Sequence, residues 1–297
     1  MVEERDLRRI IALRKCGNKK RKESASIMTF PLNIIGMDLS PLVIDDDYEV
    51  IDKHQLAEWI AIMMLGQYAH IYMIIEKLSP MEMPSEKALI DYMLSKLMVP
   101  SDNQTLIEHR DGWLFQMMSW IALNIKLHAD FPGCTIHMAA PHDAPVKHGL
   151  DGLALVVTAD NKVSRIVITE DKCTKNPQSY IRYNVLPEFE EYEKNLYDNK
   201  LISELTQLIN PATHIGLYIA LSPSFANHDN WSYRIGITRQ DAHDNANGRK
   251  NLYDGYDSKV SGNVSRRNGA SVNLPDLRAW MQDLSDRVCA VLRSKKV

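Results

Sequence analysis

Two short apolar runs near the middle of the chain predict a β-hairpin. They cover residues 151–157 and 163–172, and both are rich in Val, Ile and Leu. Between them, Ala159–Lys162 contains Asp-Asn, a pair typical of tight turns. A turn centred on this pair places Asp151, at the start of the first run, directly opposite Glu170, near the end of the second.

The alternation of side chains along a strand then brings charges together. Glu170 and Lys172 share one face of the hairpin, whereas the side chain of Asp171 points to the other face. Residues directly opposite each other have Cβ atoms about 4.5–5.5 Å apart, so the carboxylate of Asp151 lies close to that of Glu170. Facing like charges destabilise a strand pair, and a divalent cation that prefers carboxylate oxygens is a natural partner for them.

Apolar positions elsewhere predict further helices and strands. Pro187 lies inside one of the helices and is expected to kink or split it. A period of 3.6 residues predicts helices over residues 52–78, 85–97, 102–128, 179–198, 201–209 and 275–293. Runs rich in β-branched residues predict strands over residues 135–140, 214–221 and 231–238. This order of elements indicates an α/β (α+β) sheet domain.

Two stretches show no clear periodicity. Residues 23–50 carry Asp45–Asp47, for which we predict a loop or helix-capping cluster rather than a metal site, and residues 239–273 are polar and rich in Gly and Asn. We therefore divide the chain into a basic arm and helical region, residues 1–100, and a sheet domain with a strand-loop-helix extension, residues 101–297.

Composition narrows the class of protein without identifying its function. A hydrophobic content of 45% in 297 residues is ordinary for a globular protein with a sizeable core. The net charge of −3 argues against a protein that coats nucleic acid through bulk charge. The four cysteines form no CxxC pair, so we expect neither a disulfide framework nor a zinc knuckle. We expect no secretory signal and no membrane-spanning segment, and the cytoplasm is the default compartment.

Basic residues gather in two places. Residues 1–22 are either a solvated terminal helix or an arm that binds nucleic acid or a protein partner. Arg249, Lys250, Arg266 and Arg267 lie in the second unpatterned stretch, where they are candidates for contacts with a DNA backbone. A solvated loop is the alternative for this stretch.

The charges of the hairpin have the residue types that metal-dependent phosphodiester cleavage needs. Such cleavage uses carboxylates to hold the metal, a positioned water and a positive charge for the transition state. Asp151 and Glu170 supply carboxylates, and the backbone carbonyl of Asp171 is a further candidate metal ligand. Lys172 is the right type of residue to orient or deprotonate the water, or to stabilise the transition state. The sequence Gly-Leu-Asp-Gly at 149–152, the apolar hairpin and Glu-Asp-Lys together resemble the PD-(D/E)xK, or restriction-endonuclease-like, superfamily.

The resemblance implies a fold, a cofactor and a substrate. The fold is a mixed sheet flanked by helices, with the Asp on one strand and the Glu-x-Lys on the next, here preceded by an N-terminal helical extension. The cofactor is Mg²⁺ (or Mn²⁺) held by Asp151 and Glu170, Lys172 is the catalytic lysine, and DNA is the substrate. The match is close over residues 148–172 and loose over 104–222.

The superfamily also suggests accessory residues and partners. Members usually place a Glu or Gln on the preceding helix near the metal; Glu108 and Gln116 compete for this place, and Gln116 is favoured by its Gly-aromatic-Gln context. Gln178 resembles a polar position after the motif, and His148 is a candidate for contact with a phosphate. The chain most resembles nuclease subunits of bacterial anti-phage systems, notably the Hachiman-type nuclease that works beside a helicase, with effectors of cyclic-oligonucleotide systems as the alternative.

Other interpretations remain open. His137, His142 and His148 with Asp143 are candidates for a zinc site, although their spacing fits no compact motif. The chain could be a non-catalytic subunit that keeps the nuclease fold and binds nucleic acid or a helicase, or a small-molecule enzyme on another α/β fold. No Walker, GxSxG or HExxH motif occurs, so ATPase, esterase and zincin functions lack support.

Overall fold

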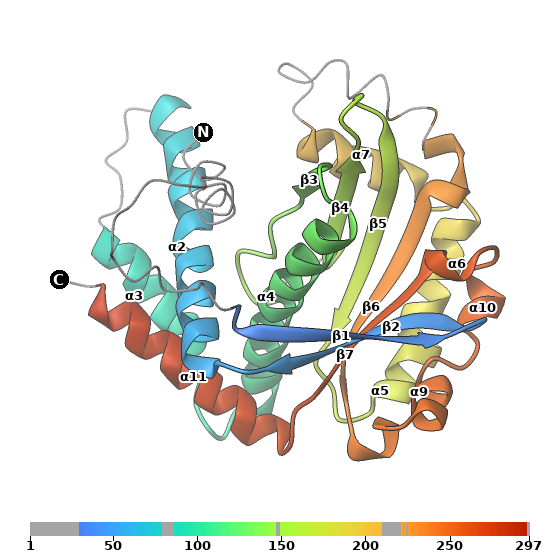
Figure 1. Ribbon diagram of the computed structural model, residues 1–297. Coiled ribbons are helices and arrows are strands. Elements are labelled where there is room, and N and C mark those ends of the chain that lie inside the picture. Colours follow the sequence, from blue (N-terminus) through green and yellow to red (C-terminus); the bar gives the residue numbers. More distant parts are fainter. Residues whose placement is uncertain are drawn as a thin grey trace, which may run out of the picture.

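The centre of the protein is a mixed sheet of seven strands in the order β1-β2-β7-β6-β5-β4-β3 (Figure 1). The computed structural model describes residues 30–78, 86–146, 149–209, 221, 223 and 225–295, with only the backbone of 67–78 and 86. The strands are Leu32–Leu39 (β1), Val43–Val50 (β2), Thr135–Met138 (β3), Gly152–Val157 (β4), Val163–Lys172 (β5), Trp231–Arg239 (β6) and Arg267–Asn273 (β7). The pairs β2–β7, β7–β6 and β6–β5 are parallel and the others antiparallel.

Helices cover both faces of this sheet. One group comprises Lys53–Leu78 (α2), Glu86–Leu97 (α3), Gln104–Asp130 (α4) and Leu277–Ser294 (α11). The other comprises Pro177–Tyr180 (α5), Leu186–Glu193 (α6), Asp198–Leu208 (α7), Ala246–Leu252 (α9) and Tyr256–Lys259 (α10). Figure 1 shows α4 along one face of the sheet with α2, α3 and α11 beside it, and α6, α9 and α10 toward the opposite side. The predicted α/β architecture, a mixed sheet flanked by helices, is therefore confirmed.

The two faces of the sheet pack into different apolar cores. Ile166 and Ile168 of β5 pack with Phe189 of α6 in the core on one face. Val167, between them in sequence, packs with Leu123 of α4 on the other face. Because side chains alternate in this way, consecutive charged residues at the end of β5 also point into different layers.

The predicted hairpin is present, with nearly the predicted register. The pairing Gly152–Thr169 and the next four pairs follow the register expected from the turn. Val157 instead pairs with Val163, which introduces a β-bulge beside the turn. Asn161 in that turn adopts a left-handed conformation with φ of 61°, which asparagine tolerates better than most residues. The open end of the hairpin is therefore aligned as predicted.

Most predicted helices are also present, and the helix predicted over residues 179–198 is divided ahead of Pro187. The proline follows a π-helical turn, Ile181–Val185, that joins α5 to α6. In this turn the N–H of Leu186 donates to the carbonyl of Ile181, five residues back. The wider turn absorbs the missing N–H of the proline without ending the helix.

The two stretches predicted as loops contain three strands. Residues 23–50 include β1 and β2, and residues 239–273 include β7, which lies between β2 and β6 in the sheet. The prediction of a boundary at residue 100 is therefore wrong for the sheet, since strands from both sides of it pair with each other. Asp45–Asp47 lie within β2 rather than in a loop or at a helix cap.

The prediction that a basic loop contacts DNA is wrong for three of its four residues. The guanidinium groups of Arg249, Arg266 and Arg267 are buried and bind other parts of the chain, whereas Lys250 is exposed. Arg249 pairs with Asp45 and Asp47, Arg266 with Glu193, and Arg267 donates to the carbonyls of Pro41, Leu42, Val260 and Gly262. These groups hold strands and helices together and cannot reach a phosphate.

Some predictions fall outside the described residues. They are the basic arm over residues 1–22, His148, and the strand over 214–221, of which only Leu221 is described and is helical. Within the described part of the chain, no helix is long and apolar enough to cross a membrane. Cys134, Cys173 and Cys289 are free thiols.

Candidate active site

The three charged residues predicted to converge do so at the open end of the β4–β5 hairpin. The ammonium of Lys172 lies between two carboxylates, donating to Asp151 Oδ2 over 3.0 Å and pairing with Glu170 Oε1. The side chains of Asp151 and Glu170 are only 17% and 9% exposed. A single ammonium thus holds two nearly buried carboxylates within reach of each other.

Backbone and helix contacts fix the position of Asp151. The backbone N–H of Asp171 donates to Asp151 Oδ2 over 3.0 Å. From α4, the amide of Gln116 donates to the backbone carbonyl of Asp151 over 2.9 Å and to its Oδ1 over 3.2 Å. The Asp151 carboxylate therefore accepts hydrogen bonds at both oxygens, which restricts its rotation.

Gln116 is in turn held by the loop after β3. Its Oε1 accepts from the backbone N–H of His142 over 3.2 Å, and the indole N–H of Trp113 donates to the carbonyl of His142 over 2.7 Å. The structure thus brings Gln116 to the charged cluster. Glu108, the competing residue two turns earlier on α4, pairs with Arg278 over 3.2 Å instead.

Burial and mutual repulsion shape the electrostatics of the cluster. Burial, followed by the charge of Asp151, raises the pKa of the Glu170 carboxyl well above its usual range, against the attraction of Lys172. Burial opposes the charge on Lys172, but the carboxylates of Asp151 and Glu170 outweigh it and raise the pKa of this lysine. The cluster holds two carboxyl groups and one ammonium, and a further positive charge would stabilise the ionised form of both carboxyls.

Asp171 points to the opposite face, as the alternation predicts. Its carboxylate accepts from Ser119 Oγ over 2.6 Å and pairs with Arg234 over 3.3 Å. Burial raises the pKa of Asp171 to about 6, against the attraction of Arg234. A Cβ at Gly236 would lie 1.8 Å from Asp171 Oδ1, so the neighbouring strand needs glycine there. Sequence reasoning missed Ser119 and Arg234; a polar residue on the apolar face of α4 was the available signal for the first.

Gln178 does not join the cluster. Its side-chain amide donates to the backbone carbonyl of Asn251 over 2.9 Å, which links the start of α5 to α9. The predicted accessory role of Gln178 is therefore not supported by its contacts. The zinc alternative includes His148, which lies outside the described residues; within them, no group of three or more His, Cys, Asp or Glu could hold a metal ion.

The donor set of the cluster fits a hard cation that keeps part of its water shell. Asp151 and Glu170 offer carboxylate oxygens, and the backbone carbonyl of Asp171 is a candidate third oxygen. Mg²⁺ is typically bound by one or two carboxylates together with waters and substrate phosphate oxygens, so it does not need a third acidic side chain. The excess negative charge between the two carboxylates is the feature that such a cation would neutralise.

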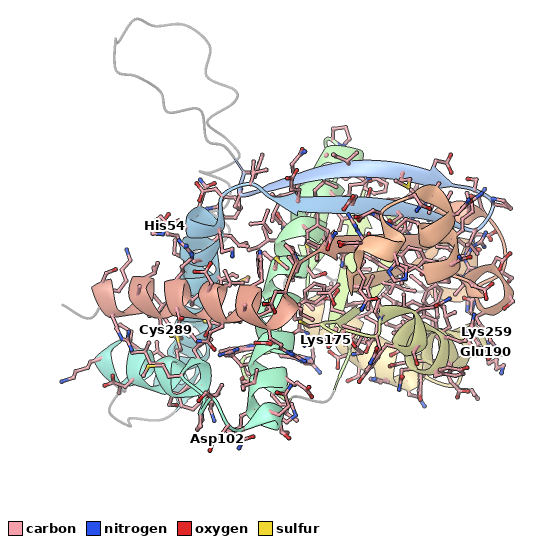
Figure 2. All side chains as sticks on the ribbon, turned by 90° about the horizontal axis from the view of Figure 1, so that it is seen from below. His54, Asp102, Lys175, Glu190, Lys259 and Cys289 are labelled. Carbon is pink, nitrogen blue, oxygen red and sulfur yellow. The ribbon has the colours of Figure 1, made fainter. Side chains whose placement is uncertain are left out.

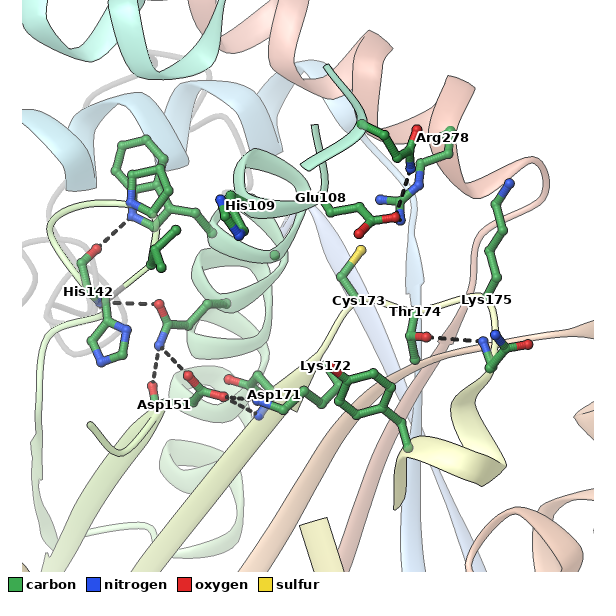
Figure 3. A pocket seen from close by; sticks show the side chains of 18 of the residues that line it. Glu108, His109, His142, Asp151, Asp171, Lys172, Cys173, Thr174, Lys175 and Arg278 are labelled. Atoms are coloured by element: carbon green, nitrogen blue, oxygen red, sulfur yellow. Dashed lines mark hydrogen bonds and ion pairs between the residues drawn. The ribbon is translucent and has the colours of Figure 1, made fainter. Parts of the chain in front are cut away.

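A pocket of about 630 Å³ leads to the cluster (Figure 3). Asp151 and Lys172 line one end of it, and Glu108 and Arg278 line the other. The rest of the wall comes from α4, the loop after β3, the segment after β5, and Tyr180 of α5. Glu170 is not part of the wall, but it pairs with Lys172, which is. We call this pocket the groove.

Comparison of the chain with protein-family models, with curated proteins and with solved structures finds no match. Any function assigned to the chain must therefore be supported by its own side chains. The cluster at the end of the hairpin is where acidic, basic and amide groups converge beside a groove.

Proposed function

We propose that the protein is a Mg²⁺-dependent nuclease that hydrolyses phosphodiester bonds of DNA. The observation that carries this proposal is the contact of Lys172 with both Asp151 and Glu170 at the end of the groove. A carboxylate directly before β4, a second on β5 and a lysine two residues after the second are also the pattern that resembles the PD-(D/E)xK superfamily. Geometry and resemblance therefore support the same chemistry.

Each residue has a distinct role in this proposal. Asp151 and Glu170 would hold the metal, with the carbonyl of Asp171 as a further ligand. When bound, Mg²⁺ polarises the phosphate and lowers the pKa of a coordinated water. Lys172 offers an ammonium to the negative charge that develops on the phosphate oxygens. Gln116 keeps the Asp151 carboxylate and its backbone in place.

The wider biological role that we propose rests on the resemblance rather than on the site. The chain would be the effector subunit of a bacterial anti-phage system that works with a helicase or another sensor. An effector of this kind needs its partner for activation, so the purified chain could be inactive on its own. Metal binding is therefore measured together with cleavage.

The proposal is tested with purified protein, supercoiled plasmid and Mg²⁺. Wild-type protein is compared with the Glu170→Ala/Lys172→Ala double variant, and Mg²⁺ binding is measured by calorimetry. The matched control is Asp160→Ala/Lys162→Ala, which removes an exposed acid–lysine pair from the turn at the far end of the same hairpin. We expect the control to nick plasmid and bind Mg²⁺ like wild type, and the Glu170/Lys172 variant to lose both.

Two results would contradict the proposal. Equal nicking by wild type and the Glu170/Lys172 variant would assign the activity to another site or to a contaminant. A wild-type protein that binds neither Mg²⁺ nor Mn²⁺ would instead favour the non-catalytic alternative, a subunit that binds nucleic acid or a helicase.

A further inference from the structure

The floor of the groove is one face of α4, and the middle position of this face has no side chain. Glu108, Gly112 and Gln116 follow one another at intervals of four residues, so they lie on one side of the helix. A Cβ added to Gly112 would meet no atom within 4 Å, which shows that this position faces open space. Glycine inside a helix costs stability relative to alanine, and here it leaves room above the floor for a ligand.

Another part of the wall of the groove carries an aromatic ring and an exposed lysine. Tyr180 is 40% exposed and lines the groove. Lys175 also lines it, is exposed, and has no carboxylate partner among the described residues. Figure 3 shows Thr174 and Lys175 on the side of the groove away from His109, and Figure 2 shows Lys175 between the two helical layers.

The size of the groove limits what can enter it. A volume of about 630 Å³ lies within the range of about 300–1,000 Å³ typical of pockets for single small molecules. One or two nucleotides of a single strand fill such a space, whereas a duplex would bring two backbones and a stack of base pairs. Aromatic side chains and lysines along a channel are the elements that bind single strands without sequence preference.

We propose that the groove binds single-stranded nucleic acid, with one base stacked on Tyr180 and the adjacent phosphate contacted by Lys175. The strand would pass over Gly112 and deliver the next phosphate to Asp151 and Lys172. The direction of this path rests on the proposed nuclease function, whereas binding to Tyr180 and Lys175 does not. The substrate of the site would therefore be a nucleic acid single strand or the frayed end of a duplex.

Binding is measured without cleavage, by fluorescence anisotropy of wild-type protein with Ca²⁺ in place of Mg²⁺. The probes are a labelled 12-nucleotide DNA single strand and a blunt duplex of this strand with its complement. Gels check that both probes stay intact. We expect the single strand to bind at least ten times more tightly. Tyr180→Ala should weaken that binding roughly 5- to 150-fold, the range for loss of one stacked base, whereas Tyr180→Phe should retain it.

Tyr183→Ala is the matched control. Tyr183 lies three residues later, is 70% exposed and does not line the groove, so its removal should leave binding unchanged. Lys175→Ala should lower the slope of log affinity against log salt by about 0.7, the value for one phosphate contact of a single strand. Gly112→Met should block binding without lowering the melting temperature, because it fills the groove while improving helix propensity.

The inference is overturned if the duplex binds as well as the single strand, if neither probe binds, or if Tyr180→Ala binds like wild type. It is also overturned if Tyr183→Ala weakens binding as much as Tyr180→Ala. Plasmid nicking that needs Glu170 and Lys172 but not Tyr180 would retain the proposed function and remove this inference. If single-strand binding needs Tyr180 but the protein neither binds Mg²⁺ nor cleaves DNA, this inference is retained and the proposed nuclease function is removed.

Discussion

Lys172 contacts the carboxylates of both Asp151 and Glu170, so its ammonium is the nearest positive charge to each of them in the part of the chain that the structure describes. A divalent cation that binds these carboxylates has to compete with it. We expect Lys172→Met to bind Mg²⁺ about 10-fold more tightly or better, since removal of a unit charge at such short range is worth a few kcal/mol. The same variant should lose cleavage.

Calorimetry with Mg²⁺ and plasmid nicking measure these two effects separately. Lys175→Met is the control for metal affinity, because Lys175 has no carboxylate partner among the described residues. Weaker Mg²⁺ binding by Lys172→Met than by wild type would contradict the competition between the ammonium and the metal.

Gln116 and Glu108 are the two candidates for the accessory residue on α4, and single substitutions distinguish them. Gln116 donates to both the carbonyl and the carboxylate of Asp151, whereas Glu108 pairs with Arg278. We expect Gln116→Ala to lower the rate of cleavage about 10- to 100-fold, as is common for residues that orient a metal ligand. Glu108→Ala should change it less than about threefold. Initial rates at saturating Mg²⁺ decide between them, and the reverse ranking would assign the accessory role to Glu108.

The sequence was sufficient to predict Asp151, Glu170 and Lys172 as one cluster, because the hairpin turn alone sets their register. It could not choose between Gln116 and Glu108. Both lie on the same face of α4, and the choice depends on how far along the sheet the helix packs. That position is set by contacts such as Trp113 with the carbonyl of His142, which no local pattern reveals.

Among the elements, β2 shows why three strands were missed. Its three consecutive aspartates suggest a loop, yet Asp47 is neutralised by Arg239 and Arg249, and Asp45 by Arg249, from about 200 residues away. Strand propensity here is decided by distant partners rather than by neighbours in sequence. Long amphipathic helices such as α4 and α11 need no such partner to show their period, which is why they were predicted.

Asp46, the middle aspartate of β2, faces the opposite helical layer from Asp45 and Asp47. Its negative charge is less well neutralised than theirs. Burial raises the pKa of its carboxyl from 3.8 to about 6, against the attraction of Lys126, which lies 3.7 Å away. The folded state therefore holds this proton more tightly than the unfolded state. As far as this group is concerned, stability is highest below about pH 4, falls between about pH 4 and 6, and stays constant above that.

Asp46→Asn removes this cost, so we expect it to stabilise the protein at pH 8 by up to about 3 kcal/mol, from 1.36 kcal/mol per pKa unit. The gain should vanish below about pH 4. Urea unfolding at several pH values measures it, with Asp38→Asn as a control on the same β1–β2 hairpin, because the carboxyl of Asp38 is exposed. A gain that does not depend on pH would contradict this explanation.

At the scale of the whole molecule, Asp45 joins the first and last parts of the sheet. It pairs with Arg249 of α9 and accepts hydrogen bonds from Tyr253 over 2.7 Å and from Ser271 of β7 over 3.0 Å. Asp45 and Arg249 are fully buried. Without Asp45, the buried guanidinium of Arg249 keeps the partly exposed Asp47 as its acidic partner among the described residues, and loss of one partner of a buried ion pair is destabilising.

We expect Asp45→Ala to lower the free energy of unfolding by about 3–5 kcal/mol, as for other buried pairs that lose one partner. Replacing Asp45 and Arg249 together by Leu and Met should cost less, because the buried guanidinium is removed with its buried partner and Asp47 keeps its pair with Arg239. Chemical unfolding followed by circular dichroism compares these variants with Asp160→Ala in the exposed turn. A loss below about 1 kcal/mol for Asp45→Ala would show that the network is dispensable.

The parallel pairing of β2 with β7 also sets an order of events during synthesis. Ile44 pairs with Asn268, so 224 residues separate the partners (268 − 44). At about 5–20 residues per second, the ribosome needs roughly 10–45 s to reach β7 after making β2. During that interval the β1–β2 hairpin has no strand to pair with on its inner edge, and Asp45 has no arginine. The sheet closes only when the last quarter of the chain has emerged.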